Sequence, residues 1–86
     1  IGNDASWQQI ARDQVTLLGD AVGTVLRRTN YHTVAEGYGG KGLLITDPAD
    51  VDEALRQAKV WAKEGIPSCL NVHLQKSDFR EGSLSI

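Results

Sequence analysis

The sequence predicts an α/β fold, and we expect a partial three-layer α/β/α arrangement built on parallel strands. Two short apolar stretches, residues 43–46 and the segment "SCLNVHL", flank a long amphipathic helical pattern. Strand, helix and strand within about thirty residues form a βαβ unit, in which the two strands are parallel and the crossover is right-handed. The segment "SCLNVHL" is apolar enough to be covered on both faces, as strands of parallel sheets usually are.

Length and charge narrow the possible classes of protein. The 86 residues allow one domain at most, and a domain of that size buries only roughly 60 to 70% of its unfolded surface. The formal net charge is -2, and the nine Lys and Arg residues are spread along the chain. Because they form no basic stripe, nucleic acid is not an expected partner.

The sequence shows neither a membrane span nor a targeting signal. No apolar run approaches the roughly 20 residues that a span needs, and no basic-then-apolar leader is present. We therefore expect no membrane contact in this segment and a cytoplasmic location. Cys69 is the single cysteine, and its apolar neighbours predict a buried thiol in a reducing compartment. Methionine is absent, and we interpret the chain as processed or cut from something larger.

Helical periodicity near the amino terminus predicts a helix from Ser6 to Leu18. Ser6 and Gln9 have the spacing of a capping box, and Gly19 is a typical helix stop. The residues before Ser6 are interpreted as the end of a strand, and the following stretch "DAVGTVLRRTNY" as a loop. Core packing is the default expectation for Trp7. The apolar positions of this helix are Trp7, Ile10, Ala11, Val15, Leu17 and Leu18.

A shorter helix is predicted from Tyr31 to Tyr38, with Thr29 or Asn30 as its cap. The glycines of "GYGGKG" end it, because they permit a positive φ. This segment follows a helix and precedes a strand, which is the reverse of the order in Walker and dinucleotide-binding loops. We therefore interpret it as a helix stop and a turn.

The long helix between the two strands has the clearest start signal in the chain. In "DPAD", Asp47 is a cap and Pro48 occupies the first helical position. Gly65 and Pro67 end the helix, and the second strand follows. Its apolar face consists of Val51, Ala54, Leu55, Ala58, Trp61 and Ala62.

One polar cluster, in "GNDAS", has the composition of a ligand site. Asn3 and Asp4 offer oxygen ligands suited to a hard cation such as magnesium, and the helix after them presents N–H groups to an anion. The cluster falls at the carboxyl end of a strand, where ligands bind in open α/β sheets. The alternative is that Asp4 or Ser6 only caps the helix. His32 and His73 have no Cys or His at ligand spacing and are interpreted as surface or hydrogen-bonded histidines.

Three segments together carry a family resemblance: "GNDASWQQIARDQ", "TNYHTVAEGYGGKGLLI" and "CLNVHLQKSDFREGSLSI". The chain resembles the carboxyl-terminal end of thiamin diphosphate-dependent enzymes. The resemblance is nearest to the acetolactate synthase-like branch, which borders on the 2-hydroxyacyl-CoA lyases. The resemblance extends over essentially the whole chain. It implies that residues 1–76 are the carboxyl-terminal half of a thiamin diphosphate-binding domain and that residues 77–86 are a carboxyl-terminal tail.

The resemblance also implies a set of site residues. In the family, magnesium ties the cofactor's diphosphate to an aspartate of a Gly-Asp-Gly motif, to an asparagine, and to a backbone carbonyl two residues beyond that asparagine. Carried over, Asn3 is the side-chain ligand and Ala5 the carbonyl ligand. The cofactor-binding residues implied by the resemblance are Asn3, Ala5, Ser6, Trp7 and Gln8; Gln8 and Gln9 are further expected to face the substrate.

Two departures from the family pattern bear on activity. The family often has two asparagines in a row, and here Gly2 stands at the first of the two positions. The Gly-Asp-Gly motif and the glutamate that activates the cofactor in this family are absent from the chain. We therefore assign no catalytic residue and expect the isolated 86-residue chain to be inactive.

The resemblance implies that the parent enzyme makes or breaks a carbon–carbon bond next to a carbonyl, with thiamin diphosphate and Mg²⁺ as cofactors. The implied substrate is a 2-keto acid such as pyruvate or a 2-hydroxyacyl-CoA. Shared active sites in the family imply a homodimeric or homotetrameric parent. The alternative function is a non-catalytic α/β interaction module in which Asn3 and Asp4 only cap a helix.

Overall fold

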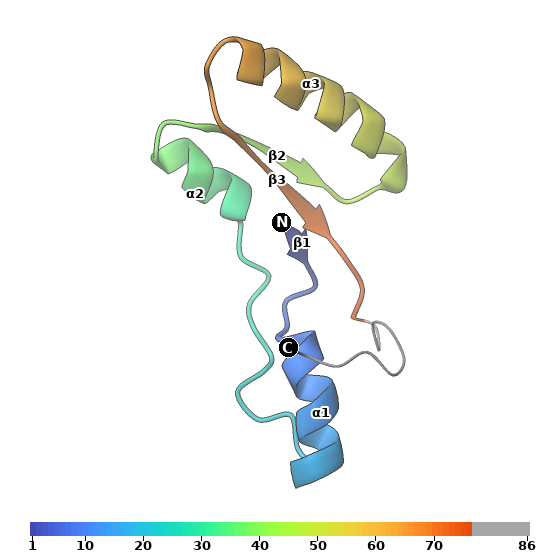
Figure 1. Ribbon diagram of the computed structural model, residues 1–86. Helices are drawn as coiled ribbons and strands as arrows, with labels where there is room; N and C mark the ends of the chain where they lie inside the picture. Colours follow the sequence, from blue (N-terminus) through green and yellow to red (C-terminus); the bar gives the residue numbers. More distant parts are fainter. Residues whose placement is uncertain (77–86) are drawn as a thin grey trace. The chain divides into compact units, whose positions relative to one another are not determined.

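A computed structural model of the chain describes residues 1–76 (Figure 1). The predicted tail, residues 77–86, lies outside the described residues. The described chain divides into two compact units, one formed by residues 1–3 and 30–74 and the other by residues 4–29 with 75–76.

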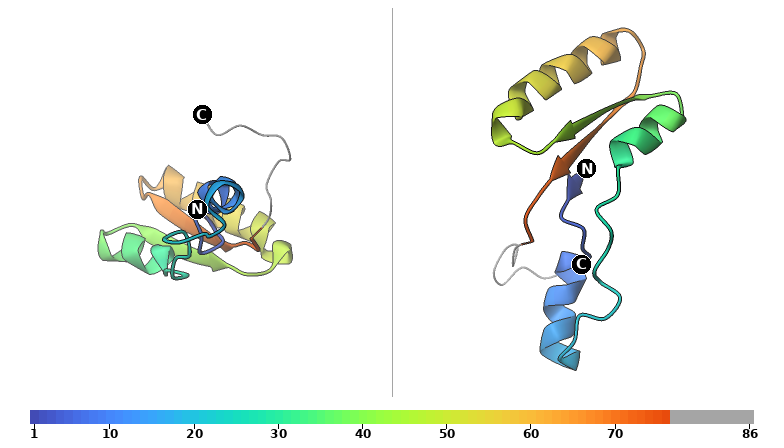
Figure 2. Two further views of the ribbon diagram at one scale, coloured as in Figure 1. Left: turned by 90° about the horizontal axis from the view of Figure 1, so that it is seen from below. Right: turned by 180° about the vertical axis from the view of Figure 1, so that it is seen from behind.

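The first unit is built on a three-stranded parallel sheet in the order β1-β3-β2. Strand β3 (Ser68–His73) lies in the middle, between β2 (Lys41–Ile45) and the very short β1 (Gly2–Asn3). Figure 2 shows β1 alongside the end of β3, where Asn3 is the register partner of His73. The predicted parallel βαβ unit is confirmed, and so is the interpretation of the first residues as the end of a strand.

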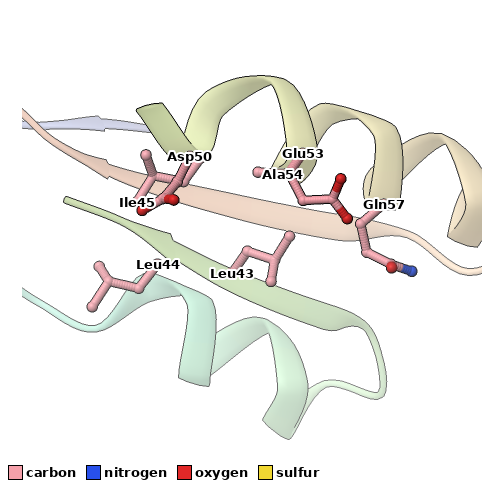
Figure 3. A pocket seen from close by; sticks show the side chains of 7 residues that line it. All are labelled: Leu43, Leu44, Ile45, Asp50, Glu53, Ala54 and Gln57. Atoms are coloured by element: carbon pink, nitrogen blue, oxygen red, sulfur yellow. The ribbon is translucent and has the colours of Figure 1, made fainter. Parts of the chain in front are cut away.

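Two helices cover opposite faces of this sheet, which gives the three layers that the sequence predicts (Figure 3). Helix α2 (Tyr31–Gly37) covers one face, and α3 (Val51–Lys63) covers the other. A 3₁₀ turn, η1 (Pro48–Asp50), precedes α3. The predicted cap at its start is confirmed, because Asp47 Oδ1 accepts a hydrogen bond from the backbone N–H of Ala49 at 2.9 Å.

Helix α2 approaches the sheet very closely at Gly42 of β2. A Cβ atom at Gly42 would lie 2.1 Å from the backbone carbonyl oxygen of His32. Only a residue without a side chain allows the first turn of α2 to rest directly on β2. Asn30 is the residue before the helix, and its side chain makes no cap hydrogen bond, so the predicted cap is wrong for Asn30.

The second unit contains α1 (Gln8–Leu18), which ends at Gly19 in the left-handed conformation, with φ 74°. The Gly19 stop is therefore confirmed. The predicted start is two residues early, and the predicted capping box is wrong. Ser6 does not enter the helix because it pairs with Val25 in an isolated antiparallel bridge. Residues 20–30 contain no helix or longer strand, as expected for a loop.

The apolar core of the described residues is small. The buried apolar side chains are Ala11, Ile45 and Ala54. Trp7 is 57% exposed, so the expectation of core packing is wrong for this side chain. Cys69 is half-buried rather than buried, and its register partner on β2 is Gly42. No helix within residues 1–76 is long and apolar enough to cross a membrane.

Candidate functional site

Asn3 occupies the carboxyl end of β1, the position that the sequence predicts for a ligand-binding residue. Parallel pairing fixes its backbone, since its carbonyl oxygen accepts a hydrogen bond from the backbone N–H of Leu74 at 2.9 Å. The residue is only 5% exposed. A buried amide side chain must have polar partners, because leaving it without them costs free energy.

The side chain of Asn3 is held by a second asparagine. Its Nδ2 atom donates to Oδ1 of Asn71 at 3.1 Å. Asn71 lies in the middle of β3 and is fully buried, and its own Nδ2 atom lies 3.3 Å from Nδ1 of His32 on α2. The interpretation of His32 as a hydrogen-bonded histidine is confirmed. A polar network therefore runs from β1 through β3 to α2.

His73 adds a fourth polar side chain to the same face of the sheet. Successive strand residues point to opposite faces, so Asn71 and His73 share one face, and Asn3 joins them as the register partner of His73. The Nε2 atom of His73 is buried and has no hydrogen-bond partner among the residues that the structure describes. The buried Nε2 atom of His73 therefore differs from the expectation of a surface or hydrogen-bonded histidine.

Asp4 closes a local turn ahead of α1. Its Oδ1 atom accepts a hydrogen bond from the backbone N–H of Ser6 at 3.1 Å, and Ser6 Oγ donates to Oε1 of Gln8 at 3.1 Å. The residue before α1 is Trp7, which makes no side-chain cap hydrogen bond. The alternative that Asp4 or Ser6 caps the helix is therefore wrong, because Asp4 accepts from the N–H of Ser6 and Ser6 Oγ donates to the side chain of Gln8, so neither side chain accepts from an N–H of α1.

Ala5, the expected carbonyl ligand, has a left-handed backbone conformation with φ 58°. Its carbonyl oxygen accepts a hydrogen bond from the backbone N–H of Leu26 at 2.8 Å. This bond fixes the direction of the carbonyl.

Two of the N–H groups expected to face an anion already have partners. The backbone N–H of Ser6 donates to Asp4, and that of Trp7 donates to the carbonyl of Thr24 at 2.8 Å. Gln8 is the first residue of α1, and an N–H in the first turn of a helix has no acceptor within the helix. Ser6 and Trp7 can therefore contact a ligand through their side chains, the hydroxyl of Ser6 and the exposed ring of Trp7, rather than through their backbone N–H groups.

The donor set is compatible with a hard cation. An amide oxygen and a backbone carbonyl oxygen are ligands that magnesium accepts in its octahedral shell, together with carboxylates, phosphates and water. No group of three or more His, Cys, Asp or Glu side chains within residues 1–76 is placed to hold a metal ion. The side-chain oxygen of Asn3 and the carbonyl oxygen of Ala5 are each of the chemical type that magnesium accepts.

A groove of about 290 Å³ lies on the other side of the sheet, between β2 and α3 (Figure 3). Leu43 and Ile45 point into it from β2, and Glu53 borders it from α3. The carboxylate of Glu53 pairs with Arg56, which lowers the pKa of Glu53 and raises that of Arg56. The polar residues that line the groove are Asp50, Glu53 and Gln57.

The fold and this network define an α/β chain with a parallel sheet and with buried asparagines on β1 and β3. Over its full length the chain is similar to 2-hydroxyacyl-CoA lyase 2 of Danio rerio, with 48% identity over 88 residues. It is 42% identical to the Bos taurus protein of the same name and 39% identical to that of Homo sapiens. The chain spans 14% of the length of each of these relatives. The predicted resemblance to the lyase branch is confirmed.

Two further comparisons found nothing. No family model matches the chain, and no solved structure matches it. The relation to the lyases therefore rests on sequence similarity to proteins of that name.

Sequence reasoning missed Asn71, the most buried member of the network. A signal was present, because a lone amide inside the apolar strand "SCLNVHL" has to find a buried hydrogen-bond partner. Its partners come from β1 and α2, 68 and 39 residues away along the chain. No local pattern identifies partners at such separations.

Proposed function

We propose that this chain is part of a thiamin diphosphate-dependent lyase that cleaves a 2-hydroxyacyl-CoA, and that it forms part of the magnesium and diphosphate site. The similarity over the full chain to proteins named 2-hydroxyacyl-CoA lyase 2 is the observation that carries the proposal. The asparagine at the end of a parallel strand supports it, because that is where ligands bind in such sheets.

In this proposal the chain's residues bind and orient the cofactor. Asn3 contributes its side-chain oxygen to magnesium, and Ala5 contributes its backbone carbonyl two residues further along. The N–H of Gln8 is directed at the diphosphate, and the hydroxyl of Ser6 and the ring of Trp7 complete the contacts. The bound cofactor supplies an electron sink for the carbon–carbon bond that breaks. The residues that activate the cofactor lie outside this chain.

The proposed reaction breaks the bond between the thioester carbonyl carbon and the carbon that carries the hydroxyl group. The hydroxyl-bearing carbon leaves as an aldehyde, and the carbonyl carbon takes up a proton to become formyl-CoA. Every atom of the 2-hydroxyacyl-CoA is thereby accounted for, and no oxidant or reductant is needed. A homodimeric or homotetrameric assembly in the cytoplasm is part of the proposal.

The test uses the full-length protein with thiamin diphosphate and Mg²⁺, offered a 2-hydroxyacyl-CoA or pyruvate in separate reactions. We expect an aldehyde and formyl-CoA from the thioester, and no acetolactate from pyruvate. Acetolactate and CO₂ from pyruvate, without thioester cleavage, would place the protein in the acetolactate synthase-like branch and refute the proposed substrate. A full-length protein that does not bind thiamin diphosphate would refute the enzyme and favour the non-catalytic interaction module.

A further inference from the structure

We propose that Asn71 is a positioning residue, which holds the side-chain amide of Asn3 in the orientation that presents its oxygen to magnesium. The inference rests on the proposed function, because it concerns the same magnesium ligand. It assigns a role to a buried residue that lies on a different strand, far from Asn3 in the sequence.

A hydrogen bond joins the side-chain amides of Asn3 and Asn71. An asparagine amide can present either its oxygen or its nitrogen to a cation, and only the oxygen is a ligand. Oδ1 of Asn71 accepts from Nδ2 of Asn3 at 3.1 Å, which commits the nitrogen of Asn3 to β3. Turning the Asn3 amide over would place two oxygens against each other and leave a buried N–H group without this acceptor.

Asn71 is itself held in place. It is 0% exposed, and its Nδ2 atom lies 3.3 Å from Nδ1 of His32. In the tautomer of His32 in which Nδ1 is an acceptor, Nδ2 of Asn71 donates to it, and the oxygen of Asn71 faces Asn3. His32 comes into reach because its own carbonyl oxygen lies where a Cβ of Gly42 would be, so that α2 rests directly on the sheet.

Asn71 is a polar residue inside an otherwise apolar strand. A buried asparagine is less favourable than an apolar residue unless its hydrogen bonds are made, so its presence in "SCLNVHL" calls for a specific partner. Replacing a residue that hydrogen-bonds to a metal ligand and orients it commonly lowers metal affinity by about 10- to 100-fold. The contact with Asn3 gives Asn71 such a role.

The test measures Mg²⁺ affinity by calorimetry in the full-length protein with saturating thiamin diphosphate. The key variant, Asn71→Leu, keeps the size of the side chain and removes its hydrogen bonds. We expect Mg²⁺ to bind about tenfold more weakly or worse, with kcat at saturating Mg²⁺ nearly unchanged. Asn71→Asp retains an oxygen that can accept from Asn3. We expect its Mg²⁺ affinity to be reduced by no more than about threefold relative to the parent.

A matched control separates positioning from general loosening of β3. Val72 is the next residue of the strand and points to the opposite face, so Val72→Ala weakens packing without touching the amide of Asn3. We expect Mg²⁺ affinity within about twofold of the parent, well short of the change that loss of an orienting partner causes. An equal loss in Val72→Ala and Asn71→Leu would overturn the positioning role, as would an Asn71→Asp variant as weak as Asn71→Leu.

The Asn3→Ala variant, measured alongside, distinguishes this inference from the proposed function. If Asn3→Ala loses Mg²⁺ affinity and Asn71→Leu does not, the positioning role is wrong and the magnesium site stands. If neither variant changes Mg²⁺ affinity, the proposed magnesium site fails as well. Should Asn71→Leu not fold, Asn71→Ser replaces it, because the shorter side chain removes the reach to Asn3; unchanged Mg²⁺ affinity in that variant would overturn the inference.

Discussion

At the scale of single residues, Asp4 and Asn3 are neighbours with different tasks. Asp4 Oδ1 bonds to the backbone N–H of Ser6, whereas the side chain of Asn3 is tied to β3. A sequence reading treats the pair as one polar cluster, because both side chains carry suitable oxygens. The structure separates them through the alternation of β1 and the turn that follows it.

This separation predicts the effect of replacing Asp4. Asp4→Ala removes the acceptor for the Ser6 N–H, and we expect a loss of about 0.5–1.5 kcal/mol in the free energy of unfolding. Asp4→Asn keeps an oxygen at that place and should change stability little. Chemical denaturation of the full-length protein measures both. A strong loss of Mg²⁺ affinity in Asp4→Asn would show that Asp4 is a ligand and contradict this assignment.

Gly42 is the residue whose replacement should disturb the fold most directly. A methyl group there would collide with the carbonyl oxygen of His32, so Gly42→Ala forces α2 away from β2. We expect a loss of about 1–3 kcal/mol in the free energy of unfolding. Gly37→Ala is the matched control, because nothing lies within 4 Å of a Cβ at that helical position. Equal stability of the two variants would refute the close approach of α2.

At the scale of elements, periodicity and stop signals predicted most of the structure. The three helices and the two main strands lie where the sequence places them, with ends that differ by one to a few residues. Gly19 and Asp47 act as predicted because their signals are local. The capping box at Ser6 failed because a bridge to Val25 competes for the backbone, and such a tertiary contact has no local signature.

The candidate site was predicted only in part for the same reason. Asn3 was identified from its residue type and its place at a strand end. Its contact with Asn71 depends on which strand pairs with β1 and in which register. Strand pairing and register depend on the packing of the whole sheet, and residue spacing along the chain does not predict them.

Helix α3 carries an ion pair that should be visible in a pH titration. Nε of Arg56 donates to Oε2 of Glu53 at 2.9 Å, one turn apart on an exposed face. This hydrogen bond lowers the pKa of Glu53 below its ordinary value. A lowered pKa in the folded state stabilises the fold above the ordinary glutamate pKa, and the contribution is lost as the pH falls through the lowered value.

We therefore expect the Glu53 carboxyl, followed by NMR, to titrate below the ordinary range and to return to it in Arg56→Gln. The stability difference between the parent and Arg56→Gln should be small, because both side chains are exposed and screened by water. It should disappear at low pH and shrink at high salt. A Glu53 pKa that is the same in both proteins would contradict the ion pair.

At the scale of the whole molecule, the described residues bury few apolar side chains and expose many. Leu17 and Leu18 of α1 are 80% and 71% exposed, and Tyr38 after α2 is 89% exposed. Exposed apolar surface of this extent is typical of surfaces that another segment or subunit covers. The chain spans 14% of the length of the Danio rerio relative, to which it is 48% identical.

The 86-residue chain expressed on its own should therefore self-associate. We expect oligomers or aggregates in sedimentation velocity, a broad thermal transition, and no lyase activity with thiamin diphosphate and Mg²⁺. The reason is that the exposed apolar side chains lack their covering surface. A monomer with a sharp cooperative transition would show that the chain is a complete folding unit.

The most direct test of the central claim is the binding of thiamin diphosphate to the full-length protein and to its Asn3→Ala variant, measured by calorimetry with and without Mg²⁺. If Asn3 is a magnesium ligand, Mg²⁺-dependent affinity for the cofactor falls about tenfold or more in the variant, while the variant remains folded. Equal Mg²⁺-dependent affinity in the two proteins would contradict the claim.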